Sequence, residues 1–415
     1  MSNTRRFLHF GLILGVSCGA MLAGNQLAAR VASTSSDFYA PLETFSQVLF
    51  RVQQNYVEER PARDLIEGAI DGMLGTLDPF SLYMDPDQYK AFQEDTRGQY
   101  FGIGVQIDAE PDALVVVAPF PGQPADLAGL KAGDRIVKVD GTSVKQLGPD
   151  GAVERIKGRK GTKVLLSVER KEWEQPRDLE VVRDEIHTPS VRADILEPGY
   201  GFVRLSQFTD GCAADVRDAI KQLSDSGPLK GVVIDLRGNP GGLLDEAVQM
   251  VDLFVDEGTI VSTRGRTEHE VDNARRSGTL DPFQITVLIN GGSASASEIV
   301  AGALQDLHRA TIAGEPSYGK GSVQNIFPLA DQSALRLTVA RYYTPSGRPI
   351  DREHPVSPDV SLPAPEGVDE GFEGGLDWLT GDALKRALAD DIQVQGALKL
   401  LHERVATAEK STQQP

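Results

Sequence analysis

Strand-like apolar runs alternate with helical stretches between residues 190 and 360, and this alternation constrains the fold more than any other feature of the chain. The runs at 231–236 and 286–290 are short, continuous and rich in β-branched residues, which indicates buried strands. Apolar residues fall at helical spacing over 213–223, 244–254 and 297–307. Such alternation is typical of an α/β layer. We therefore expect an α/β core over residues 190–362.

A chain of 415 residues is longer than one core usually supports, so further domains are expected beside this layer. Residues 98–172 are punctuated by glycine and rich in β-branched residues, which predicts a compact β-rich module. The strands expected in it are 113–117, 135–139 and 163–168, with one helix at 151–157. The predicted fold class is α/β and multidomain.

Helical segments are expected on both sides of these domains, at residues 38–95 and 370–405. Each carries an apolar stripe but is too short to bury a core of its own. The stripe of the second segment consists of Leu384, Leu388, Ile392, Leu398 and Leu401. Because an apolar stripe without an internal partner is typical of an interface, we expect a homodimer. The polar end of the chain, 406–415, is expected to be disordered.

The first 33 residues have the three parts of an export signal. Arg5 and Arg6 precede an apolar run at 7–23, and a stretch of small residues follows at 27–33. Because the run is close to the length that spans a bilayer, an uncleaved membrane anchor is the alternative to a cleaved signal peptide. Either form predicts export to the bacterial periplasm or cell envelope.

The charge and the cysteine content exclude several classes of protein. The net charge of −18 is spread along the chain and no run rich in Lys or Arg occurs, so nucleic acid is not an expected partner. The two cysteines, Cys18 and Cys212, stand in no cluster with metal-ligand spacing. We therefore expect no disulfide, no metal site and no cofactor.

A glycine loop before a strand marks a candidate peptide-binding site in the β-rich module. It consists of Phe101, Gly102, Ile103 and Gly104, and such a loop can turn its backbone N–H groups inward to hold a carboxylate. Together with the stretches 124–130 and 131–141, the loop makes residues 98–172 resemble a PDZ domain. PDZ domains add an extended C-terminal peptide to a sheet edge. The alternative is a small β-barrel whose glycines serve only its turns.

The segment 292–298 contains three serines and lies between an apolar strand and a helix. Ser295 and Glu298 fit a capping box, so one interpretation is that the serine only caps the helix. The unpaired N–H groups of a helix start can also stabilise an oxyanion. The same position is therefore suitable for a nucleophile.

A serine nucleophile needs a base, and two candidates differ in their place along the chain. His308 lies at the far end of the helix, roughly 20 Å from Ser295 at about 1.5 Å per residue. Lys320 lies in a glycine turn that can return the chain to the head of the helix. A lysine acts as a base when burial lowers its pKa, and apolar residues flank this one. Two alternatives are a solvated surface lysine and a P-loop over 314–320, although Gly321 stands where a P-loop has its Mg²⁺ ligand.

Four motifs in one order make the chain similar to the C-terminal processing peptidases, also called tail-specific proteases. They lie at 235–242, 293–298, 314–324 and 340–348, and the likeness covers about residues 40–360 with the PDZ domain included. The resemblance implies a serine endopeptidase that binds the C-terminal tails of protein substrates and forms an acyl-enzyme. An adaptor protein would be a further partner. The alternative is a non-catalytic PDZ scaffold on a protease-like fold.

The resemblance also implies roles for single residues. Ser295 would be the nucleophile, Lys320 the general base and Gln324 the residue that orients the lysine. The oxyanion hole would use the backbone N–H of Ala296 and that of a glycine in the first motif, for which we choose Gly241.

Overall fold

The computed structural model describes residues 39–187, 190–225, 227–364, 376–377, 379 and 381–412. The predicted export signal at 1–33 therefore lies outside the described residues. The chain forms two compact units, the first ending at Tyr83 and the second beginning at Met84. In the described part of the chain, no helix is both long and apolar enough to span a bilayer.

The part of the first unit that the structure describes forms helices at 39–55 and at α2 (Ala62–Leu74), and the short strand β1 (Leu82–Met84) begins at its end. Asp78 closes the turn after α2, because its carboxylate accepts hydrogen bonds from the N–H groups of Phe80 and Ser81 at 2.8 Å each. Many large apolar side chains of this unit are exposed, namely Tyr39, Leu42, Phe45, Val48, Phe50, Tyr56, Val57, Ile66, Met73 and Leu77. The expected apolar stripe thus faces solvent in the single chain.

The second unit begins with helix α3 (Pro86–Arg97), whose ends are set by the local sequence. Asp85 accepts hydrogen bonds from the N–H groups of Asp87 and Gln88, which caps the first turn. Gly98 ends the helix with a left-handed φ of 63°.

The β-rich module is an antiparallel sheet in the order β3-β4-β5-β7-β8, with β6 paired to β5. Its strands are β3 (Val105–Ala109), β4 (Leu114–Pro119), β5 (Arg135–Val139), β6 (Thr142–Ser143), β7 (Lys163–Glu169) and β8 (Arg177–Val182), and its helices are α4 (Pro124–Leu127), α5 (Val144–Leu147) and α6 (Pro149–Ile156). Alternate residues of β7 are buried, as expected for a sheet with one covered face.

A further strand pair shows where this module ends. Strand β2 (Gln99–Gly102) pairs antiparallel with β9 (Asp184–His187). The module therefore reaches His187, past the expected boundary at 172. The sequence pattern misses the last two strands because β8 and β9 are rich in charged residues.

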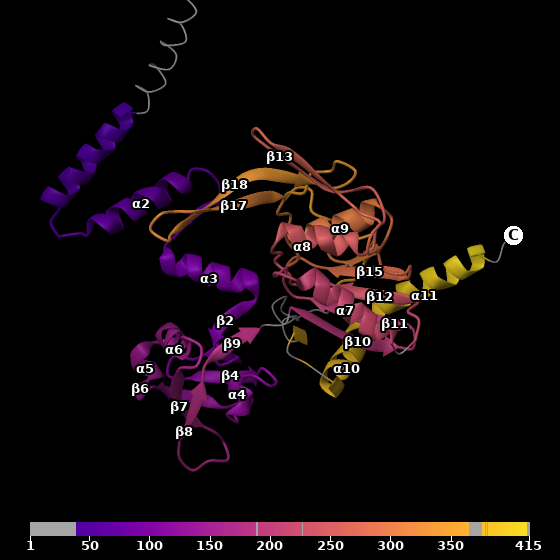
Figure 1. Ribbon diagram of the computed structural model, residues 1–415, viewed down its shortest axis with the longest axis horizontal. Helices are drawn as coiled ribbons and strands as arrows, with labels where there is room; N and C mark the ends of the chain where they lie inside the picture. Colours follow the sequence, from indigo (N-terminus) through magenta and orange to yellow (C-terminus); the bar gives the residue numbers. More distant parts are fainter. Residues whose placement is uncertain are drawn as a thin grey trace, which may run out of the picture. The chain divides into compact units, whose positions relative to one another are not determined.

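The α/β core contains a sheet in the order β10-β11-β12-β15-β16-β19. Figure 1 labels its strands β10, β11, β12 and β15. The strands are β10 (Val191–Glu197), β11 (Tyr200–Leu205), β12 (Gly231–Asp235), β15 (Gln284–Ile289), β16 (Thr311–Gly314) and β19 (Val360–Ser361). From β11 to β19 the neighbours run parallel, and β10 is antiparallel to β11. Helices α7 (Cys212–Ser224), α8 (Leu244–Asp252) and α9 (Ala296–Asp306) alternate with these strands. The α/β prediction is confirmed.

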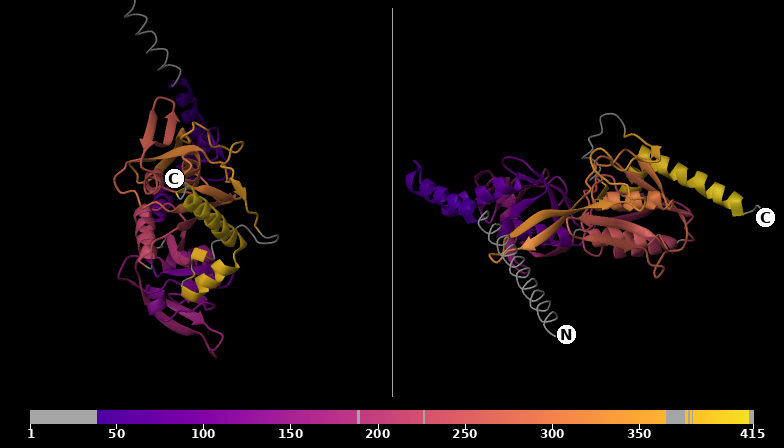
Figure 2. Two further views of the ribbon diagram at one scale, coloured as in Figure 1. Left: turned by 90° about the vertical axis from the view of Figure 1, so that its right-hand side faces the viewer. Right: turned by 90° about the horizontal axis from the view of Figure 1, so that it is seen from above.

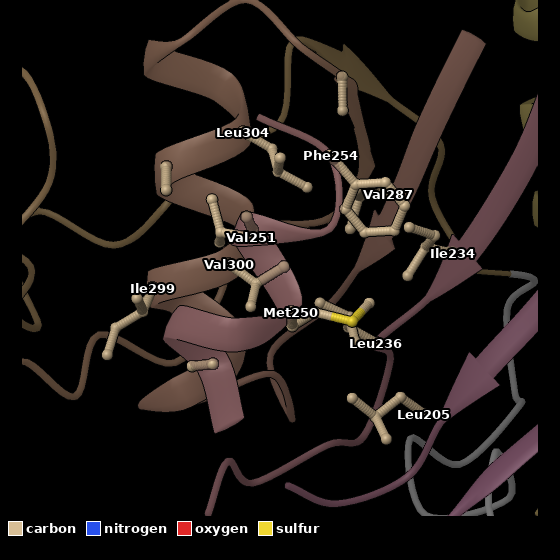
Figure 3. Close-up of a cluster of buried hydrophobic side chains, with 14 of the residues drawn as sticks. Leu205, Ile234, Leu236, Met250, Val251, Phe254, Val287, Ile299, Val300 and Leu304 are labelled. Atoms are coloured by element: carbon tan, nitrogen blue, oxygen red, sulfur yellow. The ribbon is translucent and has the colours of Figure 1, made fainter. Parts of the chain in front are cut away.

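The two faces of this sheet belong to different hydrophobic clusters. Val232 and Ile234 of β12 pack with α7, α8 and α9, whereas Val233 belongs to the cluster on the other face. Figure 3 shows the first cluster, with Leu205, Ile234, Leu236, Met250, Val251, Phe254, Val287, Ile299, Val300 and Leu304 labelled. This packing fixes α9, whose first residue follows Ser295 directly.

The C-terminal helices cover the second face of the sheet (Figure 1 and Figure 2). They are α10 (Gly381–Asp390) and α11 (Ile392–Thr412), and their buried residues Leu384, Leu388, Leu398 and Leu401 pack with Phe202, Val233 and Leu288. The prediction that this stripe lacks an internal partner is therefore wrong, because the sheet itself needs a cover on this face.

Two smaller expectations for the C-terminal segment also change. Ile392, which the pattern placed on the stripe, is 56% exposed. Helix α11 continues to Thr412, into the segment that was expected to be disordered.

A second sheet carries residues that follow the lysine loop. Its strands β17 (Ser322–Pro328), β18 (Ala334–Tyr343), β13 (Thr259–Gly265) and β14 (His269–Asn273) pair antiparallel in this order. Strand β17 begins just after Lys320, and β18 returns alongside it. Tyr342, near the end of β18, therefore lies next to the loop, where its N–H donates to the Gly321 carbonyl oxygen at 3.0 Å.

Candidate active site

Ser295 stands in the turn between β15 and α9. Its φ of 55° and ψ of −113° belong to a region that L-residues rarely adopt. Asn290 holds the turn, because its side-chain oxygen accepts hydrogen bonds from the N–H groups of Gly238 and Gly292. Strained backbone of this kind persists where the surrounding contacts determine it.

The three serines of the turn have different environments. Ser293 and Ser297 are fully buried, and their hydroxyls donate to the carbonyl oxygens of Leu236 and Asn239 at 2.7 and 2.9 Å. Ser295 is partly exposed and lines a cavity. The two outer serines thus fasten the turn to the neighbouring loop, and of the three only Ser295 is open to a substrate.

The loop at 238–242 packs so closely on Ser295 that position 241 requires glycine. Gly241 has a φ of 100°, and an added Cβ would lie 2.8 Å from the Cβ of Ser295. The Gly241 N–H donates to the Asn239 side-chain oxygen at 2.9 Å, so it is already engaged in this conformation. Of the residues next to Ser295, Ala296 and Gly242 line the cavity.

Buried ion pairs hold the start of this loop. The Arg237 guanidinium lies 2.8 Å from carboxylate oxygens of both Asp235 and Asp391, and Arg204 lies 3.3 Å from Asp235. Burial acts to raise the pKa of Asp235, but the charges of Arg237 and Arg204 hold it below its ordinary value. Asp235 therefore stays ionised and keeps both arginines in place.

Lys320 lies half-buried in the loop between β16 and β17. Burial lowers the pKa of its ammonium group and the positive charge of Arg336 lowers it further, while Glu298 acts in the opposite direction. The neutral amine is thus populated at lower pH than in an exposed lysine. Because the strand β17 follows the loop, the local structure is not that of a P-loop, which opens a helix.

Glu298 joins the serine turn to the lysine loop, a role that the sequence pattern does not reveal beyond helix capping. Its side chain is fully buried. One carboxylate oxygen accepts hydrogen bonds from the N–H groups of Ser295 and Lys320 at 2.8 Å each. The other accepts from the Gly319 N–H at 2.7 Å and the Ser317 hydroxyl at 2.5 Å. These charge-assisted bonds offset the cost of burying the carboxylate.

Of the two remaining candidates, Gln324 lines the cavity beside Ser295 and His308 does not. The Gln324 amide donates to the hydroxyls of Ser322 and Thr338 at 2.7 and 3.3 Å. Its role in orienting Lys320 stays a prediction. His308 is exposed just past the end of α9, as expected from the length of that helix.

The cavity beside Ser295 has a volume of about 440 Å³ and walls that are mostly apolar. The walls include Tyr89 and Phe92 of α3 and Leu243, Ile299, Val323 and Ile326 of the core. Helix α3 is attached here, because the Asp210 N–H donates to the Thr96 carbonyl oxygen at 3.2 Å. The sequence gives no sign of this wall, since an amphipathic pattern does not show what a helix packs against.

The glycine loop precedes a strand at the edge of its sheet. Phe101 and Gly102 end β2, and Ile103 and Gly104 lead into β3, which is an edge strand among the described strands of this sheet. Gly104 has a φ of 70°, and an added Cβ would lie 2.6 Å from the side chain of Gln123, so glycine is required. A glycine loop beside a sheet edge is the arrangement that a peptide strand needs in order to add to the sheet.

Comparison with known proteins supports the same order of domains. Residues 199–362 match peptidase family S41, residues 115–170 match the PDZ domain, and residues 20–88 match the N-terminal domain of the activating protease CtpB. The carboxy-terminal-processing protease of Bartonella bacilliformis is 42% identical over 394 residues, which cover 89% of this chain and 90% of that protein. The chain belongs to peptidase family S41, with the carboxy-terminal processing proteases.

Two further relatives are similar over most of their length. The carboxyl-terminal-processing protease of Synechocystis is 38% identical, with 82% of this chain and 83% of that protein covered. The carboxy-terminal processing protease of Bacillus subtilis is 35% identical, with 88% and 79% covered. The family predicted from the four motifs is confirmed, and this S41 peptidase is a serine-type peptidase with a PDZ domain.

Replacing Glu298 by Gln is expected to lower both stability and activity. An amide keeps one acceptor oxygen and turns an NH₂ group toward two of the present donors. Because a hydrogen bond to a charged group contributes about 1.5–3 kcal/mol, the free energy of unfolding should fall by about 3 kcal/mol or more. Urea titration measures this change.

The control for this variant is Glu315→Gln, because the partly exposed Glu315 carboxylate accepts from the Ala364 N–H at 3.0 Å and is not shared between the two loops. The control should unfold nearly like the wild type. Equal unfolding midpoints for Glu298→Gln and the wild type would contradict the linking role of Glu298.

Proposed function

We propose that this peptidase is an endopeptidase that cuts protein substrates with Ser295 as nucleophile and Lys320 as general base. The observation that most supports the pair is the Glu298 carboxylate, which receives the N–H groups of both residues at 2.8 Å. The strained serine turn and the half-buried lysine are thereby fastened to one rigid group. A dyad needs this kind of fixed geometry.

In the proposed reaction, the neutral Lys320 amine accepts the Ser295 hydroxyl proton while Oγ bonds to the scissile carbonyl carbon. Backbone N–H groups stabilise the oxyanion, with Ala296 and Gly241 as the proposed donors. Use of Gly241 requires its hydrogen bond to Asn239 to open. The C–N bond then breaks, and the lysine returns the proton to the leaving amine. Water attacks the resulting acyl-enzyme with the lysine again as base, which releases the acid and restores the serine.

The dyad predicts that Ser295→Ala, Lys320→Ala and the double variant lose a similar, large factor in kcat/KM. Residues that act as a unit give losses that do not multiply. Cleavage of an unfolded protein measures the three rates. His308→Ala is the matched control and should keep the wild-type rate, because its side chain is exposed beyond the end of α9.

The pH dependence of the same assay tests the base. Only the neutral amine accepts a proton, so kcat/KM should rise with pH through the pKa of Lys320 and become constant above it. Since burial lowers this pKa, the rise should occur below the pH at which an exposed lysine titrates. Losses that multiply in the double variant, or a rise that disappears in His308→Ala, would exclude the dyad.

We also propose that the PDZ domain selects substrates by a free, apolar C-terminus and controls access to the active site. The support is the glycine loop at 101–104, which lies beside the edge strand β3. The binding energy of a tail can change access only through different affinities for the open and closed states.

Amidation of the substrate's C-terminus should raise the KM about tenfold or more, because one charge-assisted contact of about 1.5–3 kcal/mol is lost. Deletion of residues 99–187 provides the control. Gln99 and His187 are paired neighbours, so a short linker can join the cut ends. The deletion variant should cleave amidated and free tails equally. If the intact enzyme also treats both tails alike, the PDZ domain does not read the carboxylate.

We further propose export through the segment 1–33 and a homodimer formed by the first unit. The exposed apolar side chains of helix 39–55 and α2 support this interface. Light scattering of the exported form at micromolar concentration should give the mass of a dimer or a larger species. A monomer at this concentration would contradict the interface. An adaptor protein would be a further partner.

A further inference from the structure

Tyr342 holds the lysine loop from two sides. Its side chain is almost completely buried, and its hydroxyl donates to the carbonyl oxygen of Lys320. Its backbone N–H donates to the Gly321 carbonyl oxygen at 3.0 Å. The loop therefore receives two hydrogen bonds from one residue of β18.

The opposite side of the loop is fixed by backbone. A Cβ added to Gly319 would lie 2.4 Å from the Asp351 carbonyl oxygen, and one added to Gly321 would lie 1.7 Å from that of Ile350. The loop thus runs between Tyr342 and the segment 350–351 with no room to move sideways.

The same hydroxyl interacts with the nucleophile. Ser295 and Tyr342 line the same cavity, and a hydrogen bond from the Ser295 side chain acts to lower the pKa of the Tyr342 phenol. Burial, together with the charge of Glu298, raises the pKa of this phenol well above its ordinary value, so it stays a protonated donor throughout the working pH range. Because the O–H is given to the Lys320 carbonyl, the phenol oxygen is left to accept a hydrogen bond from the Ser295 hydroxyl, whose proton passes to the Lys320 amine only in the reaction.

We propose that Tyr342 is a positioning residue that sets the side-chain orientation of Ser295 and the place of Lys320 through one shared hydroxyl. The inference rests on the proposed Ser295/Lys320 function. A serine side chain without a partner distributes over three staggered orientations. A hydrogen bond to a fixed phenol selects one of them, and the bond from that phenol to Lys320 keeps the base at a constant place relative to it.

The residue type fits this role. Tyr342 belongs to the hydrophobic core cluster, where a phenylalanine would pack equally well. Burial of a hydroxyl in such a cluster is unfavourable unless the group is hydrogen-bonded. The two partners that it finds are the two residues of the dyad.

Tyr342→Phe tests the inference, because it removes the hydroxyl and keeps the ring. We expect kcat to fall by about ten- to hundredfold, as small displacements of reacting groups do, with little change in KM. A fluorogenic peptide with an apolar C-terminus serves as substrate, and the assay runs well below the measured unfolding temperature of each variant.

Tyr343→Phe is the matched control. Tyr343 is the next residue of β18, and its ring stacks under the Arg264 guanidinium at 4.3 Å instead of lining the cavity. This variant should keep the wild-type kcat. Incorporation of 3-fluorotyrosine at position 342 retains the hydroxyl and should also keep it.

The outcomes separate the inference from the function on which it rests. A wild-type kcat in Tyr342→Phe, or a change in KM alone, overturns the positioning role while the dyad stands. Loss of kcat in a folded 3-fluorotyrosine enzyme also overturns it, since ring fit would then matter instead of the hydroxyl. If the wild type cleaves no faster than Ser295→Ala, the proposed function fails and the inference fails with it.

Discussion

The parallel register of β12, β15 and β16 brings together the segments that form the active site. Asp235 pairs with Leu288 and Ile289 pairs with Gly314, so the three strands end at one level. Three segments follow these strand ends: the loop 238–242 after β12, the turn with Ser295 after β15, and the loop with Lys320 after β16. Because the carboxyl ends of parallel strands share one edge, segments far apart in the sequence meet there.

Two buried carboxylates convert this proximity into fixed geometry. Asp235 is held between Arg204 and Arg237, and Glu298 accepts hydrogen bonds from both the serine turn and the lysine loop. A buried carboxylate keeps its desolvation cost when one donor moves away, so partial opening of the site is unfavourable. Ser295 has a positive φ, which is strained for a residue other than glycine. The hydrogen bonds of these two carboxylates sustain that strain.

The sequence alone predicts the strands and helices that follow from local periodicity, and the positions that follow from motifs. The runs at 231–236 and 286–290 are strands, and the segment 297–307 is helical, because burial periodicity needs no knowledge of partners. The motifs also predict that Ser295 belongs at a helix start. Which surface an apolar face packs against cannot be predicted in this way. The stripe of α10 and α11 was expected to form an interface, since periodicity shows that a face is apolar but not that the sheet of the same chain covers it.

The same limit applies to polar groups at the site. Nothing local shows that the Glu298 carboxylate reaches Gly319 and Lys320, because the lysine loop comes after a whole helix and strand. Likewise, the wall that α3 gives to the cavity depends on a contact between Thr96 and Asp210, in segments separated by the PDZ domain.

The C-terminal helices connect the stability of the fold to the shape of the active site. Their apolar residues cover the second face of the sheet, and this burial supplies the free energy that holds them there. Apolar contacts alone do not fix how a helix is placed along a sheet. The Arg237 guanidinium does so, because it spans Asp235 at the end of β12 and Asp391 between α10 and α11, and it also donates to Gln393 at 2.6 Å. Since Arg237 directly precedes the loop at 238–242, a displacement of α11 would pull on the loop that packs against Ser295. The cover of the sheet and the geometry of the nucleophile therefore depend on each other.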